Sequence, residues 1–130
     1  MDKKELREDA KSYFVPFLLG NNAISHRLSR QIYKRYKINC FILDTKGTPA
    51  DIFDFSSKTI KLTQTKSASL FAKELIYLAN QSRYTLPLLI VCSDKYEMLI
   101  ENERDWLEQF FVISTSKDAL LKSPLNIIPQ

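Results

Sequence analysis

The sequence predicts a three-layer α/β sandwich built on a mostly parallel sheet of about five strands. Short apolar runs alternate with segments of helical period along the chain, which is the order of elements found in α/β domains. The first run, Phe14–Asn22 (FVPFLLGNN), passes through a glycine turn into a helical segment, and the next apolar run begins at Asn39. A crossover this short returns the chain in its original direction, so the three segments form a βαβ unit of a parallel sheet.

The first half of the chain is expected to hold two strands, at Val15–Leu19 and Asn39–Leu43, around one helix at Asn22–Tyr36. Pro16 belongs near the beginning of its strand because proline cannot donate to a ladder. Asn21 or Asn22 is suited to cap the helix. Apolar residues recur every four positions in this helix and predict its buried stripe. They are Ile24, Leu28 and Ile32.

The second half is expected to continue the alternation. In order, its elements are a strand at Thr59–Thr63, a helix at Ala68–Gln81 capped by Ser67, a strand at Leu88–Cys92, helical pieces at Asp94–Ile100 and Arg104–Gln109, and a strand at Phe111–Ser114. The run Leu88–Cys92 (LLIVC) is apolar on both faces, as expected of a central parallel strand. The segments Ala50–Ser57 and Lys117–Leu121 are each compatible with a helical turn.

Length and composition indicate one cytoplasmic domain. We expect residues 1–12 to form a charged N-terminal arm and residues 13–130 to form a single domain. Apolar residues make up 45% of the chain and charged residues 26%, which is typical of a globular protein. The chain has no apolar run near the ~20 residues of a membrane span and no apolar signal core at its N-terminus.

The net charge of +4 raises the question of nucleic-acid binding. The basic residues gather in Arg27–Lys37, on a helix that also carries an apolar stripe, so a solvated face is the simpler interpretation. The two cysteines, Cys40 and Cys92, lie in expected strands. We interpret them as buried free thiols, which is compatible with both strands lying in the core. His26 is the single histidine, and its surroundings in the sequence favour a surface or packing role over catalysis and over a zinc site.

Ligands of parallel sheets sit at the carboxyl ends of the strands, so the Gly20-Asn21-Asn22 turn is the first candidate site. A dinucleotide fingerprint needs three glycines, and here only Gly20 is present, with Asn22 and Ser25 at the other two positions. Asp44 stands where a ribose-binding acid could sit, which keeps a nucleotide-binding module as an alternative. A further alternative is a non-catalytic module that holds a small anion on the free N–H groups of the first helix.

The second candidate site is the exit of the fourth strand, Ser93-Asp94-Lys95-Tyr96. Asp94 and Glu97 lie three residues apart, a spacing that allows acid–base chemistry on one helix face. The same pair also fits a capping box, in which both acids favour the helix N-terminus. We expect the structural role of this pair to prevail.

Several short motifs, in order, resemble the opening of the ATP-grasp carboxylate–amine ligases, particularly those similar to D-aspartate ligase. They are Phe14–Ser25 (FVPFLLGNNAIS), Phe41–Asp44 (FILD), Pro87–Glu97 (PLLIVCSDKYE), Leu99-Ile100 and Leu107–Ile113 (LEQFFVI). The resemblance covers roughly residues 13–115. It implies a Rossmann-like pre-ATP-grasp domain that precedes the ATP-grasp domain proper.

In complete enzymes of this kind, ATP phosphorylates a carboxylate with the help of Mg²⁺, and an amine then attacks the acylphosphate to give an amide. The resemblance implies that this domain forms one wall of the cleft and helps to hold a carboxylate or amine substrate. The matching positions are the Gly20-Asn21-Asn22 loop and the Ser93-Asp94-Lys95-Tyr96 loop. The lysines and acidic metal ligands of an ATP-grasp core are not found after Ser116, so the chain is not expected to catalyse ligation alone. Apolar surface meant for the missing ATP-grasp domain could make the chain dimerise.

Overall fold

The computed structural model describes residues 14–46, 54–63, 66–81 and 86–116. The expected N-terminal arm, residues 50–53 of the segment 50–57 and the expected helical turn at 117–121 lie outside these residues. The elements are β1 (Phe14–Leu19), α2 (Ala23–Tyr36), β2 (Cys40–Asp44), β3 (Ser57–Lys61), α3 (Ala68–Asn80), β4 (Leu86–Val91), a 3₁₀ turn (Asp94–Tyr96), α4 (Glu97–Asn102), α5 (Arg104–Leu107) and β5 (Val112–Thr115).

The strands of the described residues form one parallel sheet in the order β3-β2-β1-β4-β5. The chain therefore builds outward from β1 to β3, and then crosses back over the sheet to place β4 and β5 on the other side of β1. The order of strands reverses between β1 and β4, and a crevice outside the carboxyl ends of two such strands is where ligands of open α/β sheets bind. The predicted parallel α/β fold is confirmed.

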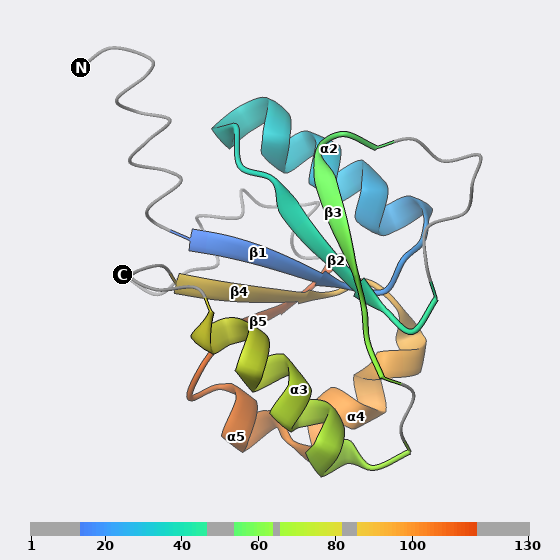
Figure 1. The fold of residues 1–130 in the computed structure, drawn as a ribbon, viewed down its shortest axis with the longest axis vertical. Coiled ribbons are helices and arrows are strands. Elements are labelled where there is room, and N and C mark those ends of the chain that lie inside the picture. The colour runs from blue at the N-terminus through green and yellow to red at the C-terminus, as the bar shows by residue number, and fades with distance from the viewer. Residues whose placement is uncertain (1–13, 47–53, 64–65, 82–85, 117–130) are drawn as a thin grey trace.

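Helices cover both faces of the sheet, with α2 on one face and α3, α4 and α5 on the other (Figure 1). Each face has its own apolar core. On the α2 side, Leu28 and Ile32 pack with Leu18 and Ile90, and on the α3 side, Phe71 and Leu75 pack with residues that include Phe17 and Leu89. Alternate residues of β1 and β4 thus enter opposite cores, which explains why these strands read as continuous apolar runs.

The predicted cap of α2 is confirmed at Asn22. Its side chain accepts a hydrogen bond from the N–H of Ser25, and the Ser25 hydroxyl accepts one from the N–H of Asn22, which completes a capping box. The predicted buried stripe is correct for Leu28 and Ile32 but wrong for Ile24, whose exposed fraction is 44%. In the first turn of the helix the buried positions are held by Ser25 and His26, so Ile24 lies on the outer face.

Pro16 lies inside β1 without breaking a ladder. The N–H of Gly20 donates to Leu43 on β2, so alternate residues back to Pro16 also face β2. Pairing between β1 and β2 begins only at Phe17, whereas pairing with β4 begins at Phe14. At Pro16 the side of β1 that faces β2 is not yet paired with a strand. The N–H that proline lacks is therefore not needed for the ladder, as the sequence predicted.

Several bounds differ from the expected elements. Strand β4 begins at Leu86, two residues before the predicted start, and α5 ends at Leu107, two residues before the predicted end. Strand β3 begins at Ser57 and ends at Lys61, two residues earlier than predicted, because it aligns with the whole of β2 from Cys40 to Asp44. The helix after β4 begins as a 3₁₀ turn at Asp94, and no side chain caps it. The predicted capping box of Asp94 with Glu97 is therefore wrong, because Ser93 and not Asp94 occupies the N-cap position and Glu97 only opens α4.

Both cysteines are free and buried, as predicted. Burial raises the pKa of Cys40 and that of Cys92 to about 12, because an apolar environment disfavours the thiolate. In the part of the chain that the structure describes, the helices are too short and too polar to cross a bilayer.

Candidate functional site

The two candidate loops meet at the carboxyl edge of the sheet, between β1 and β4. Gly20 follows β1 with φ of +116°, a backbone conformation that other residues rarely adopt. A Cβ at this position would lie 2.7 Å from the Cβ of Ser93, which follows β4 and Cys92. Glycine is therefore required here for two independent reasons, the backbone angle and the close approach of the second loop.

Asn22 fastens the two loops together. Its side-chain nitrogen donates to the carbonyl oxygen of Cys92 at 2.9 Å, while its side-chain oxygen caps α2. Asn21 is held in the same way, since its N–H donates to Asp44 at 2.7 Å and its side-chain oxygen lies 2.7 Å from Nε2 of His26. The side-chain oxygens of both asparagines and the side-chain nitrogen of Asn22 therefore already have partners inside the protein.

Asp44 is the centre of the edge. Its Oδ2 accepts the N–H of Asn21, and its Oδ1 accepts the N–H of Thr45 at 2.7 Å, the ammonium of Lys95 at 2.9 Å and the hydroxyl of Tyr96 at 2.5 Å. Burial of the carboxyl acts to raise its pKa, but these hydrogen bonds outweigh burial and lower the pKa of Asp44 to about 2. The carboxylate is thus ionised and fully compensated by donors of its own chain.

Tyr96 and Lys95 approach Asp44 from the other side of the sheet edge. The Tyr96 ring is buried and stacks on Phe71, with 5.5 Å between ring centroids. The Lys95 ammonium lies 4.8 Å from the centroid of the same ring and remains half exposed. Burial and the hydrogen bond from its hydroxyl to Asp44 raise the pKa of Tyr96, and the separate hydrogen bond from the Lys95 ammonium to Asp44 raises the pKa of Lys95. Lys95 is therefore a fixed cation at the entrance of the crevice.

Ser93 and Asp94 complete the predicted set. Ser93 is partly buried against Gly20, and Asp94 is exposed at the beginning of the 3₁₀ turn. Neither side chain takes part in any hydrogen bond or ion pair of the described residues, so both remain available to a ligand. Of the predicted site residues, Gly20, Asn21, Asn22, Asp44 and Tyr96 hold the edge together, while Ser93, Asp94 and the exposed half of Lys95 face outward.

A buried polar cluster beneath this edge was missed in the sequence. His26 lies on α2, and its Nδ1 is 2.6 Å from Oδ2 of Asp54, while both side chains are almost completely buried. Burial acts to raise the pKa of Asp54, but hydrogen bonds from Ser56, His26 and Ser57 outweigh it and lower that pKa. The sequence predicted a surface or packing role for His26, and its burial excludes the surface alternative. Its partner lies 28 positions away, so no local pattern could reveal the pair.

The cluster extends along α2. Ser56 donates its N–H and its hydroxyl to Asp54, and its hydroxyl also lies 2.8 Å from that of Ser29, which is buried on α2. Because Asn21 contacts His26 with its side chain and Asp44 with its backbone, one unbroken path of hydrogen bonds joins Asp54 to Tyr96. The path links the α2 face of the sheet to the α3 face around the carboxyl edge.

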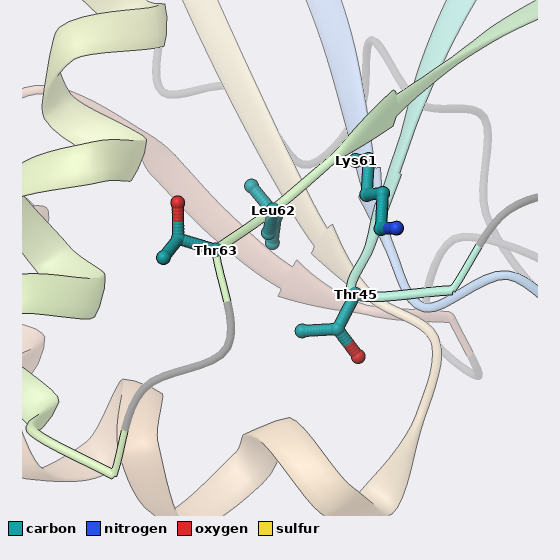
Figure 2. Close-up of a pocket in the computed structure, with 4 residues that line it drawn as sticks. All are labelled: Thr45, Lys61, Leu62 and Thr63. Atoms are coloured by element: carbon teal, nitrogen blue, oxygen red, sulfur yellow. The ribbon is translucent and has the colours of Figure 1, made fainter.

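Cavities lined by described residues open on this edge on both sides of the central strands. The larger, of about 450 Å³, lies outside β2 and β3 and is lined by Thr45, Lys61, Leu62 and Thr63 (Figure 2). The smaller, of about 220 Å³, lies outside β4 and β5. It has an apolar floor of Val91, Ile100 and Ile113, and a polar rim formed by Glu97, Glu101, Arg104, Ser114 and Thr115.

The acidic and sulfur ligands needed for a metal site do not come together in the described ranges, where no group of three or more His, Cys, Asp or Glu side chains could hold a metal ion. Comparison with protein-family models, with curated proteins and with solved structures gives no match for this chain.

Proposed function

We propose that this chain is the N-terminal, substrate-side domain of an ATP-dependent carboxylate–amine ligase of the ATP-grasp class. One observation carries the proposal. The two loops that resemble that family stand 70 positions apart in the sequence, yet Asn22 of the first donates to Cys92 at the base of the second. They meet at the point where the strand order reverses, which is the ligand edge of an open α/β sheet.

The division of labour follows from the groups at this edge. The proposal assigns ATP and Mg²⁺ to the ATP-grasp domain, where the carboxylate would be phosphorylated and the amide bond formed. In this domain, the side chains of Ser93 and Asp94 would contact an amine or a hydroxyl, and Lys95 presents a positive charge held by Asp44. These groups would bind and orient a substrate, and we assign no catalytic residue to this chain.

Two exposed apolar side chains support a partner domain at the same edge. Ile24 is the second residue of α2 and Met98 is the second residue of α4, so each follows directly after one of the two loops. Their exposed fractions are 44% and 74%. Apolar side chains placed on both sides of a cleft favour a covering domain, or in its absence a second copy of the chain.

The proposal is tested first in the gene. It expects an ATP-grasp core, with a glycine-rich loop and carboxylate metal ligands, to be encoded after the codon for Gln130 or in an adjacent gene. A genomic neighbourhood that encodes no such core contradicts the proposal.

The second test uses ADP release with ATP, Mg²⁺, a set of carboxylic acids and a set of amines. The core and this chain together are expected to release ADP, and neither is expected to do so alone. In the joined enzyme, Asp94→Asn should raise the KM for one substrate, whereas the exposed matched change Asp105→Asn on α5 should not. Release of ADP by this chain alone would show that the assignment of chemistry to the partner is wrong.

The alternative, a nucleotide-binding module that uses Asp44, has less support. A ribose hydroxyl would have to displace the hydrogen bonds that Asn21, Thr45 and Tyr96 already make to this carboxylate. Calorimetry with NAD and ATP tests it directly, and tight binding that is lost in Asp44→Ala would reverse the ranking.

A further inference from the structure

The cavity outside β2 and β3 differs from the rest of the edge because its polar side chains make few hydrogen bonds to other described residues. Figure 2 shows Lys61, at the end of β3, extending toward Thr45, which follows β2. Thr63 forms the far wall, and buried Leu62 lies between them. The cavity therefore has a cation and two hydroxyl groups around a small apolar base.

The donors of this cavity are not used by the described part of the protein. The Lys61 ammonium makes no ion pair or hydrogen bond there, and neither does the Thr63 hydroxyl. The Thr45 hydroxyl makes only a long contact of 3.4 Å with Asp44, which it can exchange for a shorter bond to a ligand. Figure 2 shows these donors on different sides of the cavity, with the hydroxyl oxygens of Thr45 and Thr63 turned away from each other. A lysine without an acceptor of its own favours an anionic ligand, and rotation of the two hydroxyl-bearing side chains would let them donate to it.

The neighbouring carboxylate does not repel such a ligand. Asp44 and Lys61 are paired in the register of β2 and β3, so they lie side by side. The charge of Asp44 is already compensated by Lys95 and by the N–H groups of Asn21 and Thr45. Glu74, the acid nearest to Thr63, accepts the Thr63 backbone N–H with both oxygens and is compensated in part.

We propose that the cavity lined by Thr45, Lys61, Leu62 and Thr63 binds the carboxylate group of a small anionic ligand, with Lys61 as its counterion. The threonine hydroxyls would donate to the remaining oxygens. The identification of this ligand with the acid substrate of a ligase rests on the function proposed above. The anion site itself rests on the cavity alone.

The experiment is a titration followed by ¹H–¹⁵N correlation spectra of the chain, without ATP and without any partner domain. Succinate and inorganic phosphate are added in separate arms at constant ionic strength, and neutral succinamide is the control ligand. We expect saturable shifts of the Thr45, Leu62 and Thr63 amides with succinate and none with succinamide. If neither succinate nor inorganic phosphate gives saturable shifts, the proposed site is wrong.

The variant Lys61→Gln should weaken succinate binding about tenfold, as expected for loss of one charge-assisted hydrogen bond. The matched variant Lys58→Gln removes the same charge from an exposed position of the same strand and should weaken binding less than twofold. Equal losses of succinate affinity in the two variants would show that binding depends only on the net charge of the chain, and the proposed site would then be wrong. Thr63→Val, which keeps all charges, should weaken binding severalfold and gives a second measurement if Lys61→Gln is poorly folded.

The two arms separate this inference from the proposed ligase function. Preference for succinate supports the carboxylate assignment, whatever the gene neighbourhood contains. Preference for inorganic phosphate overturns it and identifies a phosphate-bearing ligand instead. Because ATP-grasp chemistry is not needed for either result, failure of the ligase proposal would leave a positive titration standing.

Discussion

The two halves of the carboxyl edge of the sheet carry similar residue types but use them differently. At the exits of β1 and β4, Gly20, Asn21 and Asn22 are packed against Ser93 and bonded to neighbouring groups. At the exits of β2 and β3, the cavity beside Lys61 holds donors that the described residues leave unused. In the first half, packing and hydrogen bonds join the loops after β1 and β4, and we call this half the joint. The second half has an open cavity.

The difference shows that position on a sheet and availability for a ligand are separate properties. The rule that ligands bind at the carboxyl ends of strands points to this edge in both halves. Which groups are free is decided by contacts between distant segments, such as that of Asn22 with Cys92. The predictions below change the closed half and ask whether it behaves as a joint.

The largest effect is expected from Gly20→Ala. The new Cβ would lie 2.7 Å from the Cβ of Ser93, at a φ of +116° that alanine rarely adopts. Together the strain and the overlap should lower the free energy of unfolding by about 3 kcal/mol, measured by urea denaturation. Adding Ser93→Gly removes the overlapping Cβ and should recover part of the loss, whereas full stability of Gly20→Ala would show that the joint is not tight.

The next effect is expected from His26→Leu. Leucine fills a similar volume but leaves Asp54 and the Asn21 side-chain oxygen without their bonds to the imidazole. Two buried acceptors lose a partner, so unfolding free energy should fall by about 2.5 kcal/mol. Arg27→Leu, at the exposed neighbouring position, should change it by less than about 0.5 kcal/mol, and equal losses would contradict a special role for the buried pair.

A slightly smaller effect is expected from Asp44→Asn. The amide replaces one acceptor with an NH₂ group that faces donors, and Lys95 loses its counterion. The expected loss is about 2 kcal/mol in urea denaturation at neutral pH. The matched variant Asp94→Asn, at an exposed carboxylate outside the network, should be nearly neutral, and the opposite order of the two variants would refute Asp44 as the centre of the joint.

The pH dependence of stability should report the same carboxylate. The pKa of Asp44 is about 2 in the folded state and ordinarily 3.8, so the folded state binds fewer protons between these values. Its contribution is present above about pH 4 and is lost as the pH falls through about 2, and the lowered pKa of Asp54 acts in the same direction. We expect on the order of 1 kcal/mol from Asp44 after solvent screening, visible as a shallower acid slope in Asp44→Asn.

The smallest effect on stability is expected from Ile24→Ser combined with Met98→Ser. Both side chains are exposed, so unfolding free energy should change by less than about 0.5 kcal/mol. Self-association, measured by sedimentation velocity, should weaken if these residues flank the proposed docking edge. Leu70→Ser with Tyr77→Ser, on the outer face of α3, is the matched control. An equal loss of self-association in this control would show that Ile24 and Met98 do not mark a specific docking edge.

Most of the fold follows from local signals in the sequence. The apolar runs identify β1, β2 and β4 because a strand buried on both faces needs an uninterrupted apolar sequence. The bounds of β3 could not be predicted, since the strand is weakly apolar and its ends are set by pairing with β2. Ile24 was misplaced because a search for apolar periodicity cannot recognise a buried polar face, and Ser25, His26 and Ser29 occupy that face of α2.

The candidate site was predictable only in part. The sheet rule led to the loops at Gly20 and Ser93, which the structure brings together at the carboxyl edge, and Asp44 stands at the end of its strand as expected. The pairing of His26 with Asp54 and the cavity beside Lys61 depend on segments brought together by folding, and neither leaves a local pattern. The nearest local signal is at Asp54 and Ser56, where a side-chain oxygen accepts the N–H two residues on, as in an Asx turn.

The two buried thiols are expected to react slowly with thiol reagents in the native fold. Cys40 and Cys92 are the only cysteines in the sequence, and both stay protonated near neutral pH because their pKa values are about 12. Maleimides react with thiolates, which attack their double bond, so the two thiols of the native fold should resist labelling. A cysteine introduced at Asp94 could then be labelled alone, and a fluorophore attached there would sense the arrival of a substrate or a covering domain without any change to the core.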